Sequence, residues 1–415
     1  MNSLIHPDQT WTLWALIVSG TCLAIWLEQT YRWAAKLSGP VLALLIAMML
    51  SNFKVMPTEA PCYDFVTDYL LPLAIPLLLF RANIVKIARE TGWMLVAFHI
   101  STLGTVLGAI LAVFLLHGRV ERLPELAGIM TASYVGGMVN FFAVQDSFAT
   151  SGTLTGPLIV ADNFIMAGIL VALLFISGSK FFLRHYSHPH TPDVDATDKN
   201  AGDEKSKNLA AEHWRRKDVS LLDIAKALAV AFIVVAISAV IRQQMEVWLR
   251  APVIAELISN KVVMSVVFGI LCNKFVWITF VSMLVATIFH RQIEKINGAD
   301  EMGGFMLYIF LFSVGLPADL VQVLSKMPDL FVFCTIIAVT NLVFTLVVGR
   351  LFNFDLEELL LCVNASIGGP PTAAAMAIAK GWSQLVLPAL LVGIWGYTIG
   401  TFVGILVGQS LMMFK

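Results

Sequence analysis

One acidic side chain, Asp162, lies inside an otherwise apolar run of residues and is followed directly by Asn163. An ionised aspartate at the centre of a transmembrane helix costs at least about 2.5–3.5 kcal/mol, so such residues persist mainly where an ion or a proton binds. The alternative is a protonated Asp162 that makes only a structural hydrogen bond. We predict that Asp162 and Asn163 take part in binding a coupling ion.

Two stretches, residues 126–145 and 359–377, look like two copies of one interrupted apolar helix. The first reads Ala-Ser-Tyr-Val-Gly-Gly-Met-Val-Asn up to Asn140, and the second reads Ala-Ser-Ile-Gly-Gly-Pro-Pro-Thr up to Thr372. With a single gap, the Ala-Ser pairs and the Gly-Gly pairs coincide. An interrupted backbone in hydrocarbon leaves polar groups that are costly unless protein, water or a solute pairs them. The duplication therefore predicts a transport site, with close helix packing through the small residues as the alternative.

The second break offers oxygen atoms to a cation. Pro370 and Pro371 have no amide N–H, so the carbonyl groups of Ser366 and Ile367 lose their helical donors. Together with the Ser366 hydroxyl and the Asn364 amide, these carbonyls predict a site for a small hard cation.

Beyond each break a new half-helix begins, and we expect Asn140 and Thr372 to cap these half-helices, whose free amides attract anions. The predicted solute-binding residues are Ser133, Gly136, Gly137, Asn140, Gly368, Gly369 and Thr372. The predicted ion-coupling residues are Asp162, Asn163, Asn364, Ser366, Ile367, Pro370 and Pro371. Elsewhere, Asn341 lies near the position that aligns with Thr105, and we expect it to join helices by hydrogen bonds.

The composition is that of a membrane protein. Of 415 residues, 58% are hydrophobic and only 13% are charged, and the mean hydropathy is +0.81. Soluble proteins carry about 25% charged residues. A net charge of −1 gives no reason to expect a nucleic acid partner, and the 5 cysteines lack the paired spacing of metal ligands. We therefore expect a multi-pass protein of the inner or plasma membrane with no signal peptide, no cofactor and no metal centre.

Apolar segments recur along both halves of the chain, which indicates an internal duplication. In the first half they are residues 11–27, 40–50, 63–80, 92–116, 126–145 and 157–176. In the second half they are residues 221–241, 262–271, 276–289, 303–316, 330–348, 359–377 and 385–412. Residues 180–219 are polar and have no apolar period, which predicts a flexible linker. The expected organisation is a first transmembrane repeat (1–179), a cytoplasmic linker (180–220) and a second repeat (221–415), with the number of spans in 242–274 left open.

The distribution of basic residues predicts how the two repeats are oriented. Basic loops follow the first, third and last spans of the first half, and another follows residues 276–289. All of them can be cytoplasmic only if each half crosses the membrane an odd number of times. The predicted fold is an all-α polytopic bundle of two inverted-topology repeats, each with a broken or re-entrant helix.

The motifs also resemble known families. Residues 133–141, 161–163 and 368–375 are similar to the YjcL-like family of uncharacterised membrane proteins, over nearly the whole chain except the linker. More distantly, the paired breaks resemble those of sodium/glutamate symporters, and the polar pair after a broken helix is similar to that of cation/proton antiporters. These resemblances imply an elevator-type secondary transporter with a scaffold and a mobile core.

We therefore predict an ion-coupled secondary transporter, driven by Na⁺ or H⁺, for a small anionic organic solute. The expected partners are this solute or an ion and membrane lipid, with a homodimer as a possible assembly. A cation/proton antiporter without organic solute is the main alternative, because Asp162 alone would suffice for it. An intramembrane enzyme is disfavoured because the chain has no HExxH or GxSxG motif and no paired carboxylates at helical spacing in a span, so we predict no catalytic residue. The absence of a Walker A motif disfavours transport driven directly by ATP. A scaffold would not need duplicated breaks.

Overall fold

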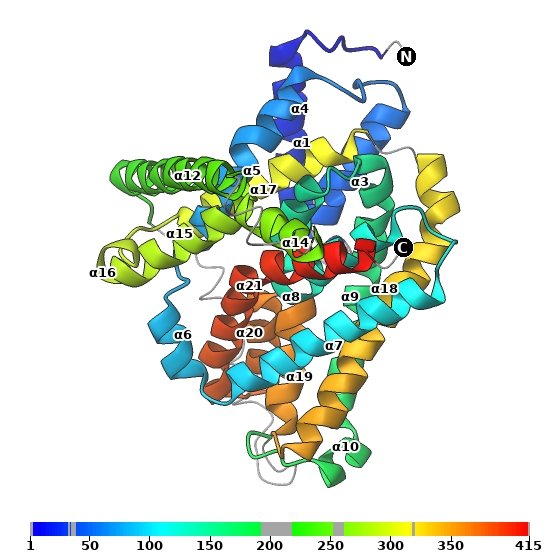
Figure 1. Cartoon of the computed structure of the whole chain (residues 1–415), viewed down its shortest axis with the longest axis vertical. Helices are drawn as coiled ribbons and strands as arrows, with labels where there is room; N and C mark the ends of the chain where they lie inside the picture. Colours follow the sequence, from blue (N-terminus) through cyan, green and yellow to red (C-terminus); the bar gives the residue numbers. More distant parts are fainter. Residues whose placement is uncertain are drawn as a thin grey trace.

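The computed structural model describes residues 3–31, 34, 39–191, 218–251, 261–317 and 320–413, and these residues form helices joined by turns and loops (Figure 1). In the first half the elements are α1 (Thr10–Thr30), α3 (Gly39–Asn52), α4 (Pro61–Phe65), η1 (Val66–Leu70), α5 (Leu71–Leu78), α6 (Ile84–Thr91), α7 (Met94–Leu115), α8 (Leu123–Ser147), α9 (Gly152–Gly178) and α10 (Lys180–His185). In the second half they are α12 (Leu221–Leu249), α14 (Lys261–Leu271), α15 (Lys274–Ile288), α16 (His290–Ile293), α17 (Ala299–Gly315), α18 (Leu320–Leu351), α19 (Leu356–Ile367), α20 (Pro370–Ala379), η2 (Ser383–Leu385) and α21 (Val386–Met413). Within the described part, 7 helices are long and apolar enough to cross a membrane. The predicted all-α polytopic fold is confirmed.

The predicted span at residues 63–80 is divided into α4, η1 and α5. Pro72 and Pro76 lie in this stretch, and neither can donate the backbone hydrogen bond that a continuous α-helix needs. The chain makes one π-helical segment, Val66–Leu70, immediately before Leu71 and Pro72. A π-turn is a common way to take up such a missing bond. The length of the apolar run was predicted correctly, but its internal geometry was not.

Two ambiguous stretches of the sequence are partly described. α12 extends to Leu249, past the predicted end at Ile241, and a capping box between Ser220 and Asp223 fixes its start. The short apolar run predicted at 262–271 forms α14, while residues 252–260 lie outside the described chain. The described part of this stretch therefore adds one short helix, α14.

Only the two ends of the predicted linker lie within the described residues, since 192–217 lie outside them. Its first residues form α10, and the chain then docks on the start of α19. The Leu356 N–H donates to the Ser187 carbonyl at 2.8 Å, and the Thr191 hydroxyl donates to Glu357 Oε1 at 2.8 Å. The entry to the second broken helix is thereby tied to the end of the first repeat.

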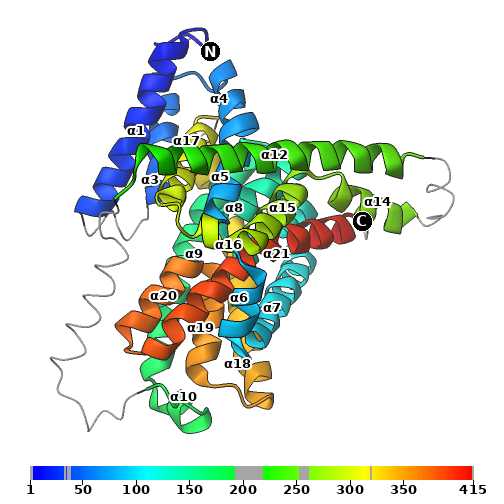
Figure 2. The same ribbon diagram turned by 90° about the vertical axis from the view of Figure 1, so that its left-hand side faces the viewer.

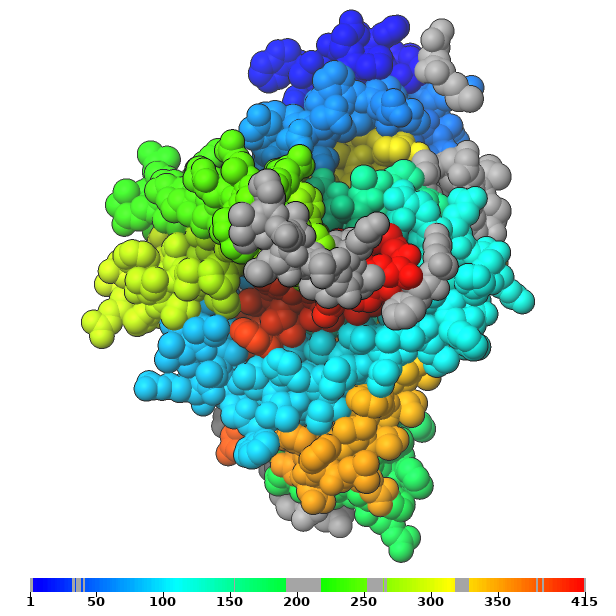
Figure 3. Space-filling model, viewed as in Figure 1, coloured from blue at the N-terminus to red at the C-terminus, as the bar shows by residue number. Residues whose placement is uncertain are grey.

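The broken helix α8 lies in the middle of the molecule, and α19 lies below it in both views (Figures 1 and 2), while α20 lies near the left-hand edge of the helices in Figure 2. α8 packs along α21, α7 packs along α18, and α19 contacts α7, α9 and α21. In the most apolar 18 residues of α8, 89% of the residues are buried, whereas the figure for α12 is 22%. α8 is therefore central and α12 is peripheral. In the space-filling view, α21 is visible only as a narrow red band above α7 (Figure 3).

The contacts between the two halves are reciprocal. The broken helix α8 of the first half packs on α21, the last helix of the second half. The broken helix α19 of the second half contacts α9, the last long helix of the first half. Two copies of one unit are expected to pack in this way, with the broken helix of each copy against the last long helix of the other. The inverted orientation of the two units across a membrane stays a prediction.

Candidate functional site

The first break divides α8 at Gly136 and Gly137. Gly136 has φ −134° and ψ 16°, and Gly137 has φ 70°, a conformation that favours glycine. Asn140 was expected to cap the second half-helix, and this is wrong. Its amide nitrogen donates back to the Gly136 carbonyl, and its Oδ1 accepts from both the backbone N–H and the hydroxyl of Thr401. The polar groups of Asn140 are thus all used inside the protein.

The second break separates α19 from α20. Gly369 has φ +83°, so the helix ends and restarts at Pro370. Thr372 therefore lies inside α20 and does not cap it as expected; its hydroxyl donates to the Gly369 carbonyl at 2.9 Å. Asn364 bridges the two half-helices, because its amide nitrogen donates to the Thr372 carbonyl at 3.2 Å and to Met376 Sδ at 3.3 Å.

The two breaks touch one another. The hydroxyl of Ser366, two residues before Gly368, donates to the carbonyl of Tyr134, two residues before Gly136. Both Ser366 and Tyr134 are fully buried, and Thr105 also donates to the Tyr134 carbonyl, at 3.3 Å. Side chains of α7 and α19 therefore meet at one backbone carbonyl of α8, next to the first break.

Asn341 of α18 extends this junction. Its amide donates to Thr105 Oγ1 at 2.6 Å and to Ser366 Oγ at 3.4 Å, and its Oδ1 accepts from Ser101 at 3.0 Å and from Thr345 at 3.2 Å. The predicted role of Asn341 as an interhelical joint is confirmed. The Ser366 hydroxyl belongs to the same joint.

Tyr397 of α21 lies beside both breaks, although it was not among the site residues predicted from the sequence. A Cβ atom built on Gly137 would lie 3.0 Å from Tyr397 Cε1, and one built on Gly369 would lie 3.3 Å from the Tyr397 hydroxyl. Both glycines have positive φ. The only sequence signal was a tyrosine within the last apolar run.

A row of glycines lets α21 approach α8 closely. A Cβ on Gly396 would lie 2.3 Å from the Val135 carbonyl oxygen, and one on Gly136 would lie 2.4 Å from the Gly396 carbonyl oxygen. The row consists of Gly396, Gly400, Gly404 and Gly408, while Gly393, one turn earlier, faces Pro370 of α20. Small residues at this spacing are the signature of close helix contacts in membranes. The alternative interpretation of the glycines, that they allow close helix packing, thus holds for Gly136. The regular spacing of glycines in residues 385–412 is the sequence signal that could have predicted this contact.

Asp162 lies on α9 and is 5% exposed. Its carboxylate accepts a hydrogen bond from Ser133 Oγ at 2.9 Å. Asn163, its predicted companion, donates to the Ile159 carbonyl of its own helix at 2.8 Å. The Tyr134 hydroxyl has no hydrogen bond of good geometry within the described chain, but it interacts with Asp162 electrostatically.

The predicted ion-coupling residues therefore fall into three neighbouring groups. Asp162 bonds with Ser133, Ser366 bonds with the Tyr134 carbonyl, and Asn364 faces Thr372. Ser133 and Tyr134 are consecutive, so the first two groups share one turn of α8. These contacts do not bring all the predicted oxygens together in one cavity, and Asn140 lies apart with Thr401.

A cavity of about 210 Å³ lies beside the N-terminal turns of α21 and is lined by Leu387, Leu390, Leu391 and Ile394 of that helix. Its wall also contains two ion pairs. Arg81 Nη2 lies 3.1 Å from Asp300 Oδ2, and Lys86 Nζ lies 3.3 Å from Glu294 Oε1. Ile394 is one turn of helix before Tyr397, so this cavity approaches the breaks from one side.

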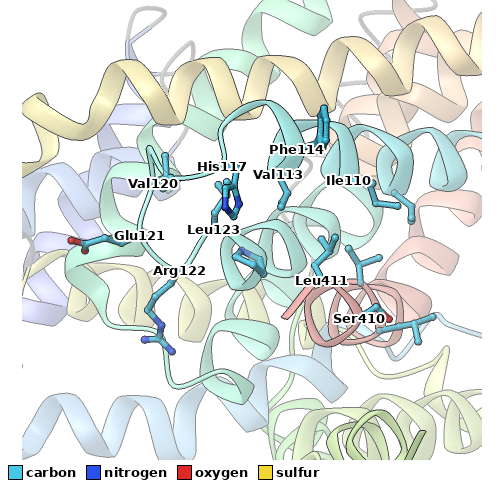
Figure 4. A pocket seen from close by; sticks show the side chains of 15 residues that line it. Ile110, Val113, Phe114, His117, Val120, Glu121, Arg122, Leu123, Ser410 and Leu411 are labelled. Atoms are coloured by element: carbon cyan, nitrogen blue, oxygen red, sulfur yellow. The ribbon is translucent and has the colours of Figure 1, made fainter. Parts of the chain in front are cut away.

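A second cavity, of about 1030 Å³, lies between the end of α7, the start of α8 and the end of α21 (Figure 4). Its walls are mostly apolar, with His117, Glu121 and Arg122 contributed by the loop before α8. Arg122 already pairs with Glu125 and donates to the Phe148 carbonyl. No residue of either break lines this cavity, so its size alone does not make it the site.

Within the described part of the chain, no three His, Cys, Asp or Glu side chains gather as a metal site would require. A cation at the breaks would therefore be held by neutral oxygens or by Asp162 alone.

Comparisons with known proteins agree with the motif analysis. A family model described as "Protein of unknown function (DUF819)" matches residues 15–414. The chain is 42% identical over 409 residues to "Uncharacterized membrane protein YjcL" of Bacillus subtilis (strain 168), which covers 99% of this chain and 98% of that protein. The predicted resemblance to YjcL-like proteins is confirmed, as is the prediction of an integral multi-pass membrane protein.

Proposed function

This chain belongs to the DUF819 family, and we propose that it is an ion-coupled secondary transporter whose translocation site is the junction of its two helix breaks. One observation carries the proposal. Two interrupted helices, one from each half, touch in the buried centre through Ser366 and the Tyr134 carbonyl. Interrupted helices that meet inside a bundle are the usual architecture of solute and ion sites in secondary transporters.

Coupling to a cation is supported by Asp162. The side chain is buried on a long apolar helix, where a carboxylate is costly, and it lies one hydrogen bond away from the first broken helix. A protonation change or a bound cation at Asp162 would act directly on Ser133, three residues before Gly136. The charge of Asp162 is thereby linked to the geometry of the break.

A small anionic solute is supported by two features. The cavity of about 210 Å³ is of the size of a small organic molecule, and two of its wall residues are Arg81 and Lys86. A solute carboxylate could replace Asp300 as the partner of Arg81. The half-helix that starts at Met138 would then offer amide groups to the anion near the break, because its first residues carry free N–H groups.

The elevator type is supported by how the helices group. α17 packs on α3 and α5, α1 packs on α3, and α12 packs on α5 and α15. These helices would form the scaffold. The helices around the breaks, α7, α8, α9, α18, α19, α20 and α21, would form the body that moves.

A cation/proton antiporter is the second candidate, and the isolated position of Asp162 favours it. The carboxylate contacts Ser133 and lies apart from the Arg81 cavity, so it could exchange a proton for a cation without any organic solute. We propose no enzymatic activity in either case.

The test is an uptake screen with the purified full chain in proteoliposomes. A library of small organic anions is offered under an imposed inward Na⁺ gradient, an imposed proton gradient, or neither. We expect at least one anion to accumulate in the presence of a cation gradient. Exchange of Na⁺ for H⁺ with no solute uptake would favour the antiporter, and no flux of either kind would contradict transport.

A further inference from the structure

An unsatisfied oxygen lies at the second break. Asn364 is 1% exposed, and its amide nitrogen is occupied by the Thr372 carbonyl and by Met376. No group in the described chain donates a hydrogen bond to its Oδ1 atom. A buried acceptor of this kind is costly unless a donor or a cation pairs it, and such atoms are rare in proteins.

Other oxygens surround the same place. A Cβ atom built on Gly368 would lie 2.5 Å from Thr372 Oγ1, 3.0 Å from Asn364 Oδ1 and 3.2 Å from the Asn364 carbonyl oxygen. These oxygens therefore converge on the open side of Gly368. The Thr372 hydroxyl donates its proton to the Gly369 carbonyl, so its lone pairs remain available to a cation.

Two features of this break suit a cation, although the N-terminal end of α20 also faces it. The site lies at the C-terminal end of α19, which carries the negative end of the helix dipole. Pro370 and Pro371 occupy the first two positions of α20 and remove two amide donors that would attract an anion. The same prolines deprive the Ser366 and Ile367 carbonyls of helical donors.

The first break lacks these features. The asparagine that follows the first break, Asn140, has its amide nitrogen bonded to Gly136 and its oxygen bonded twice to Thr401. The two breaks are alike in sequence, but of these two asparagines only Asn364 has a side-chain oxygen without a donor in the described chain.

We propose that the second break binds one Na⁺ ion, with Asn364 Oδ1 and Thr372 Oγ1 as side-chain ligands and the hydroxyl of Tyr397 beside Gly369 within reach of the ion. Resting on the proposed function, this Na⁺ is a coupling ion bound apart from Asp162, which acts on the first break through its hydrogen bond with Ser133. All the ligands are neutral, which suits a monovalent cation and excludes a proton, because amides and hydroxyls do not titrate near neutral pH. The hydroxyl of Ser366 is not a ligand in this proposal, since it donates to the Tyr134 carbonyl and also accepts from the Asn341 amide.

The test measures Na⁺ binding without transport. The full-length protein is purified in detergent, and its melting temperature and its binding of radioactive ²²Na⁺ are measured in NaCl, KCl and choline chloride. We expect saturable ²²Na⁺ binding and a melting temperature that rises with Na⁺ but not with choline. Thr372→Val keeps the shape but loses the ligand, and we expect the Na⁺ affinity to fall by about tenfold or more.

Matched variants keep the test interpretable. Thr372→Ser retains the hydroxyl and should bind Na⁺ like the parent. Thr131→Val removes another buried threonine hydroxyl, one that bonds only to the Ala127 carbonyl of its own helix, and should also bind normally. Gly368→Ala places a methyl group among the oxygens and should abolish binding. The melting temperature in choline chloride reports whether each variant is folded.

Absence of Na⁺ binding by the parent protein, or unchanged affinity in folded Thr372→Val and Gly368→Ala, would overturn the inference. Transport driven by a proton gradient in a protein that binds no Na⁺ would overturn it while leaving the proposed transporter intact. Na⁺ binding at Thr372 in a protein that moves no solute would support the site and refute the transport proposal instead.

Discussion

At the scale of single residues, the two asparagines next to the breaks had different expected roles, Asn140 as a helix cap and Asn364 as a cation ligand, and they also have different surroundings. Asn140 follows Gly136 by four residues and bonds back to its carbonyl, whereas Asn364 precedes Gly368 by four residues and leaves Oδ1 unpaired. The sequence shows which polar residues adjoin a break. It does not show that Thr401, more than 250 residues away, supplies the partners of Asn140, because that depends on helix packing.

Asp162 was the sharpest single-residue prediction, and its burial agrees with it. Asp162→Asn keeps the size of the side chain but removes both the charge and the titratable proton. We expect transport driven by a cation gradient to fall at least about tenfold while membrane insertion is kept, because an amide is cheaper to bury than a carboxylate. Gradient-driven uptake and the melting temperature are measured together. A normal rate with unchanged ion dependence would make Asp162 structural.

Arg81 is the residue that we expect to recognise the anionic solute. In Arg81→Gln the side chain can no longer pair with a carboxylate, so the apparent KM for the solute should rise about tenfold or more, with a smaller change in the maximal rate. Initial rates of uptake over a range of solute concentrations give both values. Lys54→Gln, a lysine remote from this cavity, serves as the charge control. Equal KM values in Arg81→Gln and the parent would remove Arg81 from the solute path.

At the scale of elements, the two interrupted helices were predictable because Gly-Gly and Pro-Pro act on the local backbone. The start of the second half-helix at Pro370 could also have been predicted from the sequence, since proline suits the first position of a helix. The prediction that Thr372 caps this half-helix did not apply this rule, and it therefore placed the start of the helix two residues too late. The π-helical turn before Pro72 and the contact of α21 with α8 could not be read locally, because both depend on how neighbouring helices fit.

The close approach of α8 and α21 predicts a specific cost. In Gly396→Ala the new methyl group would lie 2.3 Å from the Val135 carbonyl oxygen, where backbone must move to make room. We expect a loss of about 1–3 kcal/mol in the free energy of unfolding, seen as a lower melting temperature in detergent. Gly168→Ala is the matched control, because nothing lies within 4 Å of its added atom. Equal melting temperatures in the two variants would show that α8 and α21 leave room for a methyl group at Gly396.

At the scale of the whole molecule, composition and periodicity were enough to predict an all-α membrane protein with an internal duplication. The reciprocal packing of α8 on α21 and of α19 on α9 fits that duplication. Which end of each repeat faces the cytoplasm follows only from the distribution of basic residues. That distribution states a statistical preference, and the helices themselves would pack identically in either orientation.

The inverted orientation makes a direct prediction about sidedness. Single cysteines placed at Lys86, before α7, and at Lys326, in α18, should react with a membrane-impermeant maleimide from opposite sides of the membrane. The labelling is compared in sealed vesicles of known orientation, with all five native cysteines, of which Cys22 is exposed and Cys272 partly exposed, replaced by serine in both proteins. Labelling of both positions from one side would favour a parallel duplication.

The central claim is that the joined breaks couple solute movement to a cation gradient. Its most direct test is uphill uptake by the parent protein in proteoliposomes, using a solute found in the anion screen. The account predicts that the solute accumulates above its external concentration while an inward cation gradient is present. It also predicts that the accumulated solute leaves when an ionophore collapses that gradient. Uptake that only equilibrates the solute, at a rate unaffected by the ionophore, would contradict it.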